Sequence, residues 1–64
     1  MELIAMMLVM ELEKLEADYG TRPAGTYRAV MHKTLVELHA TLAECPEYVL
    51  SYTYHYHRYV KLYA

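Results

Sequence analysis

Apolar residues recur along residues 2–19 at the spacing of an α-helix. When residues are placed about 100° apart, five of them fall within about 80° of one another. An amphipathic helix buries such a stripe against its neighbours. We therefore predict a helix over residues 2–19, which Gly20 is suited to end because glycine accepts the left-handed conformation just past a last turn. The stripe consists of Ile4, Leu8, Leu12, Leu15 and Tyr19.

A second helix is predicted over residues 26–45, where one face carries apolar residues at near-heptad spacing. Residues 20–25 are expected to form the loop between the two helices. A connection of about six residues is short enough to make its helices antiparallel neighbours, so the two segments predict a helical hairpin. The shared face of the second helix carries Tyr27, Met31, Thr34, Leu35, Leu38, Leu42 and Cys45.

The third segment, residues 46–63, fits a helix over a longer stretch than it fits a strand. Residues 52–57 alternate as a half-buried strand would, and tyrosine and threonine favour strands. A 3-4-3-4 helical spacing extends over about fifteen residues, and Pro46 is tolerated in a first turn. Helix is favoured, and a strand, which would need another chain to pair with, is the alternative. The helical stripe would be Val49, Tyr52, Tyr56, Tyr59 and Tyr63.

A second apolar patch, rich in methionine, lies on the opposite side of the first predicted helix. Flexible thioether side chains adapt to irregular partner surfaces, and a hairpin cannot easily bury both faces of one helix. Three covers for the patch are open: the third segment, a twin subunit or a foreign protein. We predict a partner or dimer interface formed by Leu3, Met6, Met7 and Met10.

Six of the chain's eight tyrosines lie in residues 48–63. Tyrosine joins a large apolar body to a hydroxyl that needs a partner, which suits an interface better than a dry core. The alternative is an ordinary core whose hydroxyls reach its solvent edge. Tyr54 lies off the helical stripe and is expected to be exposed. The predicted interface therefore also includes Tyr52, Tyr54, Tyr56, Tyr59 and Tyr63.

The length of the chain bears on how the fold is stabilised. Its 64 residues support one domain, which buries only about 60% of the surface of the unfolded chain. Such small folds usually need a disulfide, a metal or a second subunit. Cys45 is the only cysteine, so no disulfide can form within the chain and a reducing compartment is expected. We predict an all-α single domain, a small bundle completed by dimerisation.

Charge and hydropathy restrict the compartment and the partners expected for the protein. The apolar run of residues 3–10 is much shorter than the about 20 residues that span a bilayer, and the Met-Glu start lacks a secretory signal's basic residues. We expect a cytoplasmic protein with no membrane partner. Residues 11–18 carry four acids, whereas the last fourteen residues carry Arg58 and Lys61 and no acid. These two regions could attract each other within or between chains.

The four histidines raise a metal hypothesis. His55 and His57 would chelate an ion if residues 52–57 were a strand, but on a helix their rings point nearly opposite ways. His32 and His39 share a helical face but lie about 10.5 Å apart along the axis, too far for one ion. We expect surface or interface histidines, with no metal and no cofactor. A metal- or small-ligand-binding protein using His55 and His57 is kept as an alternative.

Catalysis and nucleic-acid binding have little support in the sequence. No acid-histidine-nucleophile set can be assembled, and no glycine-rich phosphate loop exists because the chain has only two glycines. The net charge of −2 gives no general attraction to nucleic acid. A weak nucleic-acid binder using Arg58, Lys61 and nearby tyrosines is a further alternative.

These observations favour a small interaction protein over an enzyme. We expect a non-enzymatic protein-protein interaction module, a homodimer that binds and regulates or inhibits a larger, unidentified protein. Short chains without a catalytic set are common among regulators encoded by phages and other mobile elements, which makes such an origin one expectation for this chain.

Overall fold

The computed structural model describes residues 2–19 and 24–63, and every regular element in these ranges is a helix. Helix α1 spans Glu2–Ala17, α2 spans Ala24–Thr41 and α3 spans Val49–Tyr63, with a short 3-10 helix, η2, at Pro46–Tyr48. The all-α prediction is therefore confirmed, and the tyrosine-rich third segment is helical. Gly20, the predicted terminator of the first helix, lies outside the described residues.

The chain between α2 and α3 is shaped by Pro46. Helix α2 ends at Thr41, four residues before the predicted boundary, and the amide of Cys45 donates a closing hydrogen bond of 2.9 Å to the Thr41 carbonyl. A residue before proline is disfavoured in the helical region, and Cys45 has φ −129° and ψ 66°. The η2 turn then leads into α3, because Val49 already has helical angles of −60° and −36°.

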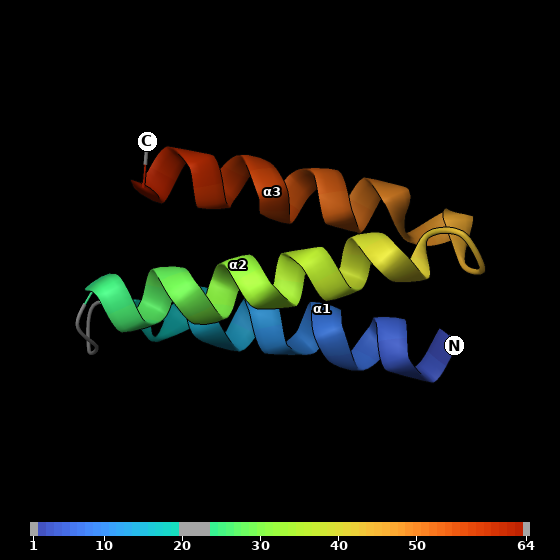
Figure 1. The fold of residues 1–64 in the computed structure, drawn as a ribbon, viewed down its shortest axis with the longest axis horizontal. Coiled ribbons are helices and arrows are strands. Elements are labelled where there is room, and N and C mark those ends of the chain that lie inside the picture. Colours follow the sequence, from blue (N-terminus) through green and yellow to red (C-terminus); the bar gives the residue numbers. More distant parts are fainter. Residues whose placement is uncertain (1, 20–23, 64) are drawn as a thin grey trace.

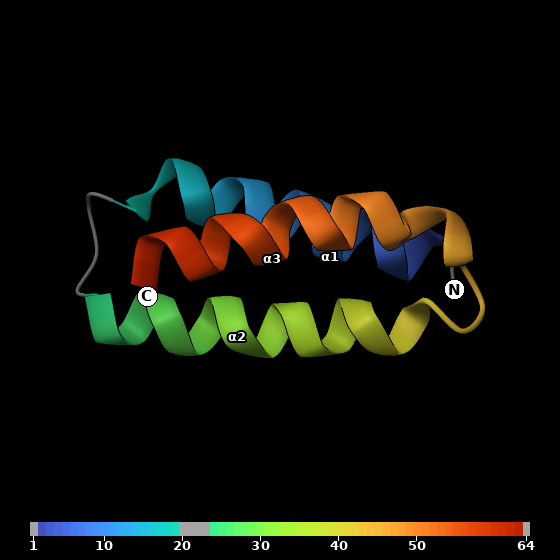
Figure 2. The ribbon, with the colours of Figure 1, turned by 90° about the horizontal axis from the view of Figure 1, so that it is seen from above.

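Helix α2 packs against both other helices, whereas α1 and α3 contact each other less extensively. Figure 1 shows α2 between the other two helices, and in Figure 2 α1 and α3 lie on the same side of α2. The radius of gyration is 11.3 Å, close to the about 10.7 Å expected of a compact 64-residue domain. Among the described residues, no helix has both the length and the apolar character needed to cross a bilayer.

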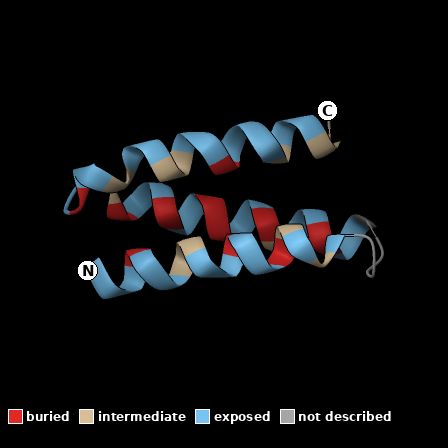
Figure 3. Ribbon diagram, turned by 180° about the vertical axis from the view of Figure 1, so that it is seen from behind, coloured by how far each residue is buried: buried red, intermediate tan, exposed pale blue. Residues whose placement is uncertain are grey.

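The core follows the face predicted for the second helix. Six of its seven residues are buried and Leu42 is half-buried, so buried positions run along the whole of α2 (Figure 3). Because α2 contacts two helices, its buried face must be wide and continuous. One cluster of buried residues comprises Ala5, Leu12, Leu35 and Leu38, and the other comprises Leu15, Tyr27 and Met31.

The buried face of α1 differs from the predicted stripe at its ends. Ile4 and Tyr19 are exposed, whereas Ala5 is fully buried. Helix α1 must contact α3 as well as α2, so its buried side lies between Leu8 and Val9, both half-buried against the core. The small Ala5 side chain fits this closely packed position.

The buried face of α3 also differs from its predicted stripe. Val49 and Tyr56 are exposed, and His55, which we expected at a surface or interface, is only 4% exposed. The buried side of α3 runs through Tyr52, His55 and Tyr59, with the two tyrosines half-buried. The predicted helical spacing is confirmed, but the predicted rotation of α3 is wrong, because His55 pairs with the largely buried Glu16 of α1.

Candidate interaction surfaces

The outer face of α1, formed by Leu3, Met6, Met7 and Met10, is open to solvent. These four residues are between 46% and 68% exposed. They point away from the core because the buried residues of α1 lie on the other side of the helix. The third helix, one of the three elements that could have buried this patch, does not cover it. A hollow of about 380 Å³ lies on the same face and is lined by Met7, Met10, Glu11 and Lys14.

A largely buried acid of α1, Glu16, lies between two basic side chains of α3. The ring Nδ1 of His55 lies 2.7 Å from Oε2 of Glu16, and Nε of Arg58 lies 3.2 Å from Oε1. The side chains of His55 and Glu16 are 4% and 9% exposed, whereas that of Arg58 is 46% exposed. One acid of residues 11–18, Glu16, therefore pairs with one of the two C-terminal cations, Arg58, within one chain. We call these three residues the Glu16 cluster.

The Glu16 cluster extends to the surface through Tyr54. Nη1 of Arg58 donates a 3.2 Å hydrogen bond to the Tyr54 hydroxyl, and the guanidinium carbon lies 5.6 Å from the centroid of the same ring. The Tyr54 ring also meets the His55 ring edge-on at 5.0 Å. Arg58 is thus held on one side by a carboxylate and on another by an aromatic ring and its hydroxyl.

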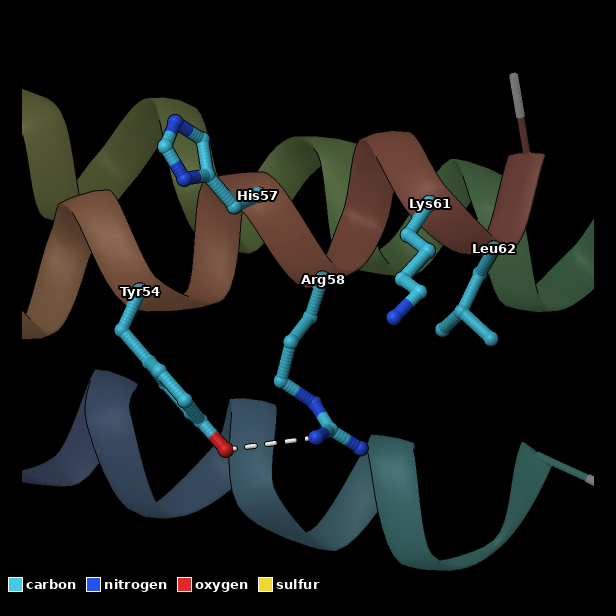
Figure 4. Close-up of a pocket in the computed structure, with 5 residues that line it drawn as sticks. All are labelled: Tyr54, His57, Arg58, Lys61 and Leu62. Carbon is cyan, nitrogen blue, oxygen red and sulfur yellow. Dashed lines mark hydrogen bonds between the residues drawn. The ribbon is translucent and has the colours of Figure 1, made fainter.

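An open groove of about 510 Å³ lies beside these residues. Figure 4 shows Tyr54 and Arg58 reaching from α3 toward α1, with Lys61 and Leu62 one turn further along. The sequence had grouped Arg58 and Lys61 with nearby tyrosines as an alternative nucleic-acid site, but it had not joined His57 and Leu62 to them. Their spacing over two helical turns is the signal that could have joined them. The groove, called the α3 groove below, is lined by Tyr54, His57, Arg58, Lys61 and Leu62.

The structure separates the predicted tyrosine interface into three places. Tyr52 lies on the α2 side of α3, with its ring 5.1 Å from the ring of His39 and 5.9 Å from the stacked ring of Tyr56. Tyr59 lies along the same side, 6.1 Å from His32 between ring centroids. Tyr54 lies on the α1 side. Tyrosines at the ends of the helices form a third group, in which Tyr63 contacts Tyr19 and Tyr59.

Burial raises the pKa values of three side chains, Cys45, Tyr48 and Tyr63. Burial raises the pKa of the Cys45 thiol above its usual value, and the negative charge of Glu47 adds to the effect. The thiol is therefore held in its unreactive protonated form. Burial likewise raises the pKa of Tyr63, whose hydroxyl has no hydrogen-bond partner among the described residues.

The histidines do not gather into a metal site in the described part of the chain. The His55 ring is buried against Glu16, whereas His57 is exposed two positions further on the same helix. No group of three or more histidine, cysteine or acidic side chains among residues 2–19 and 24–63 is placed to hold a metal ion.

Comparison with protein-family models, with curated proteins and with solved structures found no match to this chain.

Proposed function

We propose that this protein is a non-enzymatic interaction module that pairs with a second copy of itself through the outer face of α1 and, as a dimer, binds and regulates or inhibits a larger protein. The observation that carries the proposal is the exposure of four adjacent large apolar residues on the side of α1 opposite the core. Exposed apolar clusters of this kind mark interaction sites when they are contiguous.

The size of the patch supports a reversible dimer. The exposed fractions of the four residues add up to the surface of about 2.4 fully exposed residues in each copy. Since fully burying one such side chain is worth about 1.5–3 kcal/mol, two copies gain about 7–14 kcal/mol in a shared interface. Association itself costs about 4–15 kcal/mol at the standard state. A gain of the same size as this cost indicates pairing that depends on concentration.

The sequence of the outer face supports an antiparallel arrangement. Leu3, Met7, Met10 and Lys14 follow 4-3-4 spacing, which is the spacing of a coiled-coil contact line. About a two-fold axis between Met7 and Met10, Met7 would face the partner subunit's Met10. Lys14 would cover the partner subunit's Leu3 with its aliphatic stem and extend its ammonium toward the partner subunit's Glu2. The same patch then serves both copies, as a two-fold interface requires.

Sedimentation velocity over a dilution series tests the pairing. We expect the wild-type chain to change from dimer to monomer on dilution, with a melting temperature that falls in parallel. The double variant Met6→Glu/Met10→Glu should be monomeric throughout and keep its helical circular dichroism. The matched control Val36→Glu/Val60→Glu adds the same charge at exposed apolar positions of α2 and α3 and should still dimerise. A wild-type chain that stays monomeric, with stability independent of concentration, would exclude the dimer.

The larger partner is addressed by capture with tagged protein from cells, using the Met6→Glu/Met10→Glu variant as control. A cytoplasmic setting is part of the proposal, supported by the single cysteine and its burial as a protonated thiol. A protein recovered by the wild type and lost in the double variant would connect the outer face of α1 with regulation. If the wild type and the double variant recover the same proteins, the outer face of α1 is not the surface that binds them.

A further inference from the structure

The α3 groove combines basic, aromatic and aliphatic side chains along two turns of one helix. Arg58 and Lys61 carry fixed positive charges, Tyr54 presents a ring and Leu62 presents a branched apolar end (Figure 4). None of the groove's lining residues in the described part of the chain is acidic. Its volume of about 510 Å³ lies within the usual range of about 300–1,000 Å³ for binding sites, and it is partly open to solvent.

Arg58 is positioned before any ligand arrives. Its Nε lies 3.2 Å from Oε1 of Glu16 and its Nη1 donates to the Tyr54 hydroxyl, so two contacts from different helices fix the plane of the guanidinium. The Glu16 carboxylate is shared, because its second oxygen lies 2.7 Å from Nδ1 of His55. A guanidinium has five N–H donors, and these contacts account for two of them. The remaining donors suit a carboxylate, which arginine binds with two parallel hydrogen bonds.

We propose that the α3 groove binds an acidic segment of another protein, with one carboxylate on Arg58, a second near Lys61 and an intervening apolar side chain against Tyr54 and Leu62. An open groove suits an extended segment better than a small molecule, which an enclosed pocket would surround. Residues 54–62 extend for about 12 Å, enough for about four residues of extended chain. This site lies on α3 and goes beyond the self-association proposed for α1.

A peptide carboxylate fits the charges better than nucleic acid does. Single-stranded nucleic acid needs a basic track that follows many phosphates, with aromatic rings to stack the bases. The groove has two fixed cations on a chain of net charge −2. Two cations separated by one helical turn match acidic residues on a short peptide, with the apolar contacts adding selectivity.

The experiment is an NMR titration of the full ¹⁵N-labelled chain with the probe peptide acetyl-Glu-Leu-Glu-Leu-Glu-amide. We expect saturable amide shifts confined to the turns of α3 around residues 54–62. The variant Arg58→Gln should weaken binding by about tenfold, the value of one charge-assisted hydrogen bond. Lys61→Gln, which lies outside the Glu16 cluster, should weaken binding by about threefold, since a rim charge contributes less. Lys33→Gln removes an equal charge from exposed α2 and should leave binding unchanged.

Control ligands separate the alternatives. The glutamine counterpart of the peptide should cause no saturable shift, and inorganic phosphate or a thymidine oligonucleotide should bind α3 more weakly than the acidic peptide. Equal binding of the glutamine peptide, tighter binding of the oligonucleotide, or an equal loss in Lys33→Gln would overturn the proposal. If Arg58→Gln lowers the melting temperature, its weaker binding could come from lost stability. The effect of Lys61→Gln on peptide binding then decides whether the proposal holds. The Met6→Glu/Met10→Glu variant should still bind the peptide, so failure of one proposal leaves the other intact.

Discussion

Replacing Glu16 or His55 with leucine removes one side of the buried contact between α1 and α3. The two side chains are 9% and 4% exposed, so the remaining partner would keep a buried polar group without its hydrogen bond. Leaving such a group unpaired costs about 1–3 kcal/mol for a neutral group and about 3–5 kcal/mol for a buried charge. We expect each single variant to lose about 2–4 kcal/mol of the free energy of unfolding. A 64-residue domain has only about 3–10 kcal/mol in total, so the loss is large.

The double variant Glu16→Leu/His55→Leu should recover most of this loss. With both polar groups gone, neither position keeps an unpaired polar group, and two leucines add apolar surface where α1 meets α3. Arg58 loses its carboxylate too, but its side chain is 46% exposed and can be hydrated, which limits that cost to below about 1 kcal/mol. The double variant is therefore expected to be more stable than either single variant, with a coupling energy between the two positions that exceeds the about 2–4 kcal/mol lost in one single variant.

Urea denaturation followed by far-ultraviolet circular dichroism gives the four free energies of unfolding. All four proteins should carry the Met6→Glu/Met10→Glu changes, so that self-association does not contribute to stability. The milder substitution Glu16→Gln serves as a control, because the amide oxygen can still accept from the His55 ring. If the two single losses simply add in the double variant, the contact is not coupled and our account of the cluster is wrong.

Three further predictions concern other parts of the chain. Gly25 lies in α2, and a methyl group added to its Cα would meet no atom within 4 Å, so Gly25→Ala should add about 0.5–1 kcal/mol and raise the melting temperature by about 2–8 °C in a thermal scan. Because the Cys45 thiol is buried and its pKa is raised, a thiol reagent should label the folded chain at least about a hundredfold more slowly than the urea-unfolded chain. The pKa of Tyr63 is raised in the folded state, so its contribution to stability is complete below about pH 10 and is lost as the pH rises further. The urea concentration at the unfolding midpoint should therefore fall less above about pH 10 in Tyr63→Phe than in the wild type.

The second helix could be predicted well because its signal is redundant. Tyr27, Leu38 and the other members of its face repeat one spacing over five turns, and the face is buried along its length because α2 contacts both other helices. The outer face of α1 was also visible in the sequence as a second apolar patch, and its four residues are exposed in the structure. Local periodicity is sufficient where one helix has one dominant face.

The rotation of α3 about its own axis could not be predicted from the local spacing of apolar residues. Two helical stripes overlap in its sequence and share Tyr52 and Tyr59, one passing through His55 and the other through Tyr56. Hydrophobicity favours the tyrosine stripe, so the prediction placed Tyr56 inside and the histidine at a surface. What decides between them is Glu16, 39 residues away in the chain, and no local pattern contains that pairing.

The same rotation decides whether the α3 groove exists. At about 100° per residue, the stripe through Tyr52, His55 and Tyr59 and the predicted stripe through Tyr56 point about 45° apart on α3. With Tyr56 inside, Arg58 would turn about 45° further from the core and leave the carboxylate of Glu16. With His55 inside, Arg58 and Tyr54 lie at the edge of α3 that faces α1, where the carboxylate and the hydroxyl hold the guanidinium. A histidine in a row of tyrosines thus costs apolar burial but fixes one orientation of the helix, and that orientation places the basic groove beside α1.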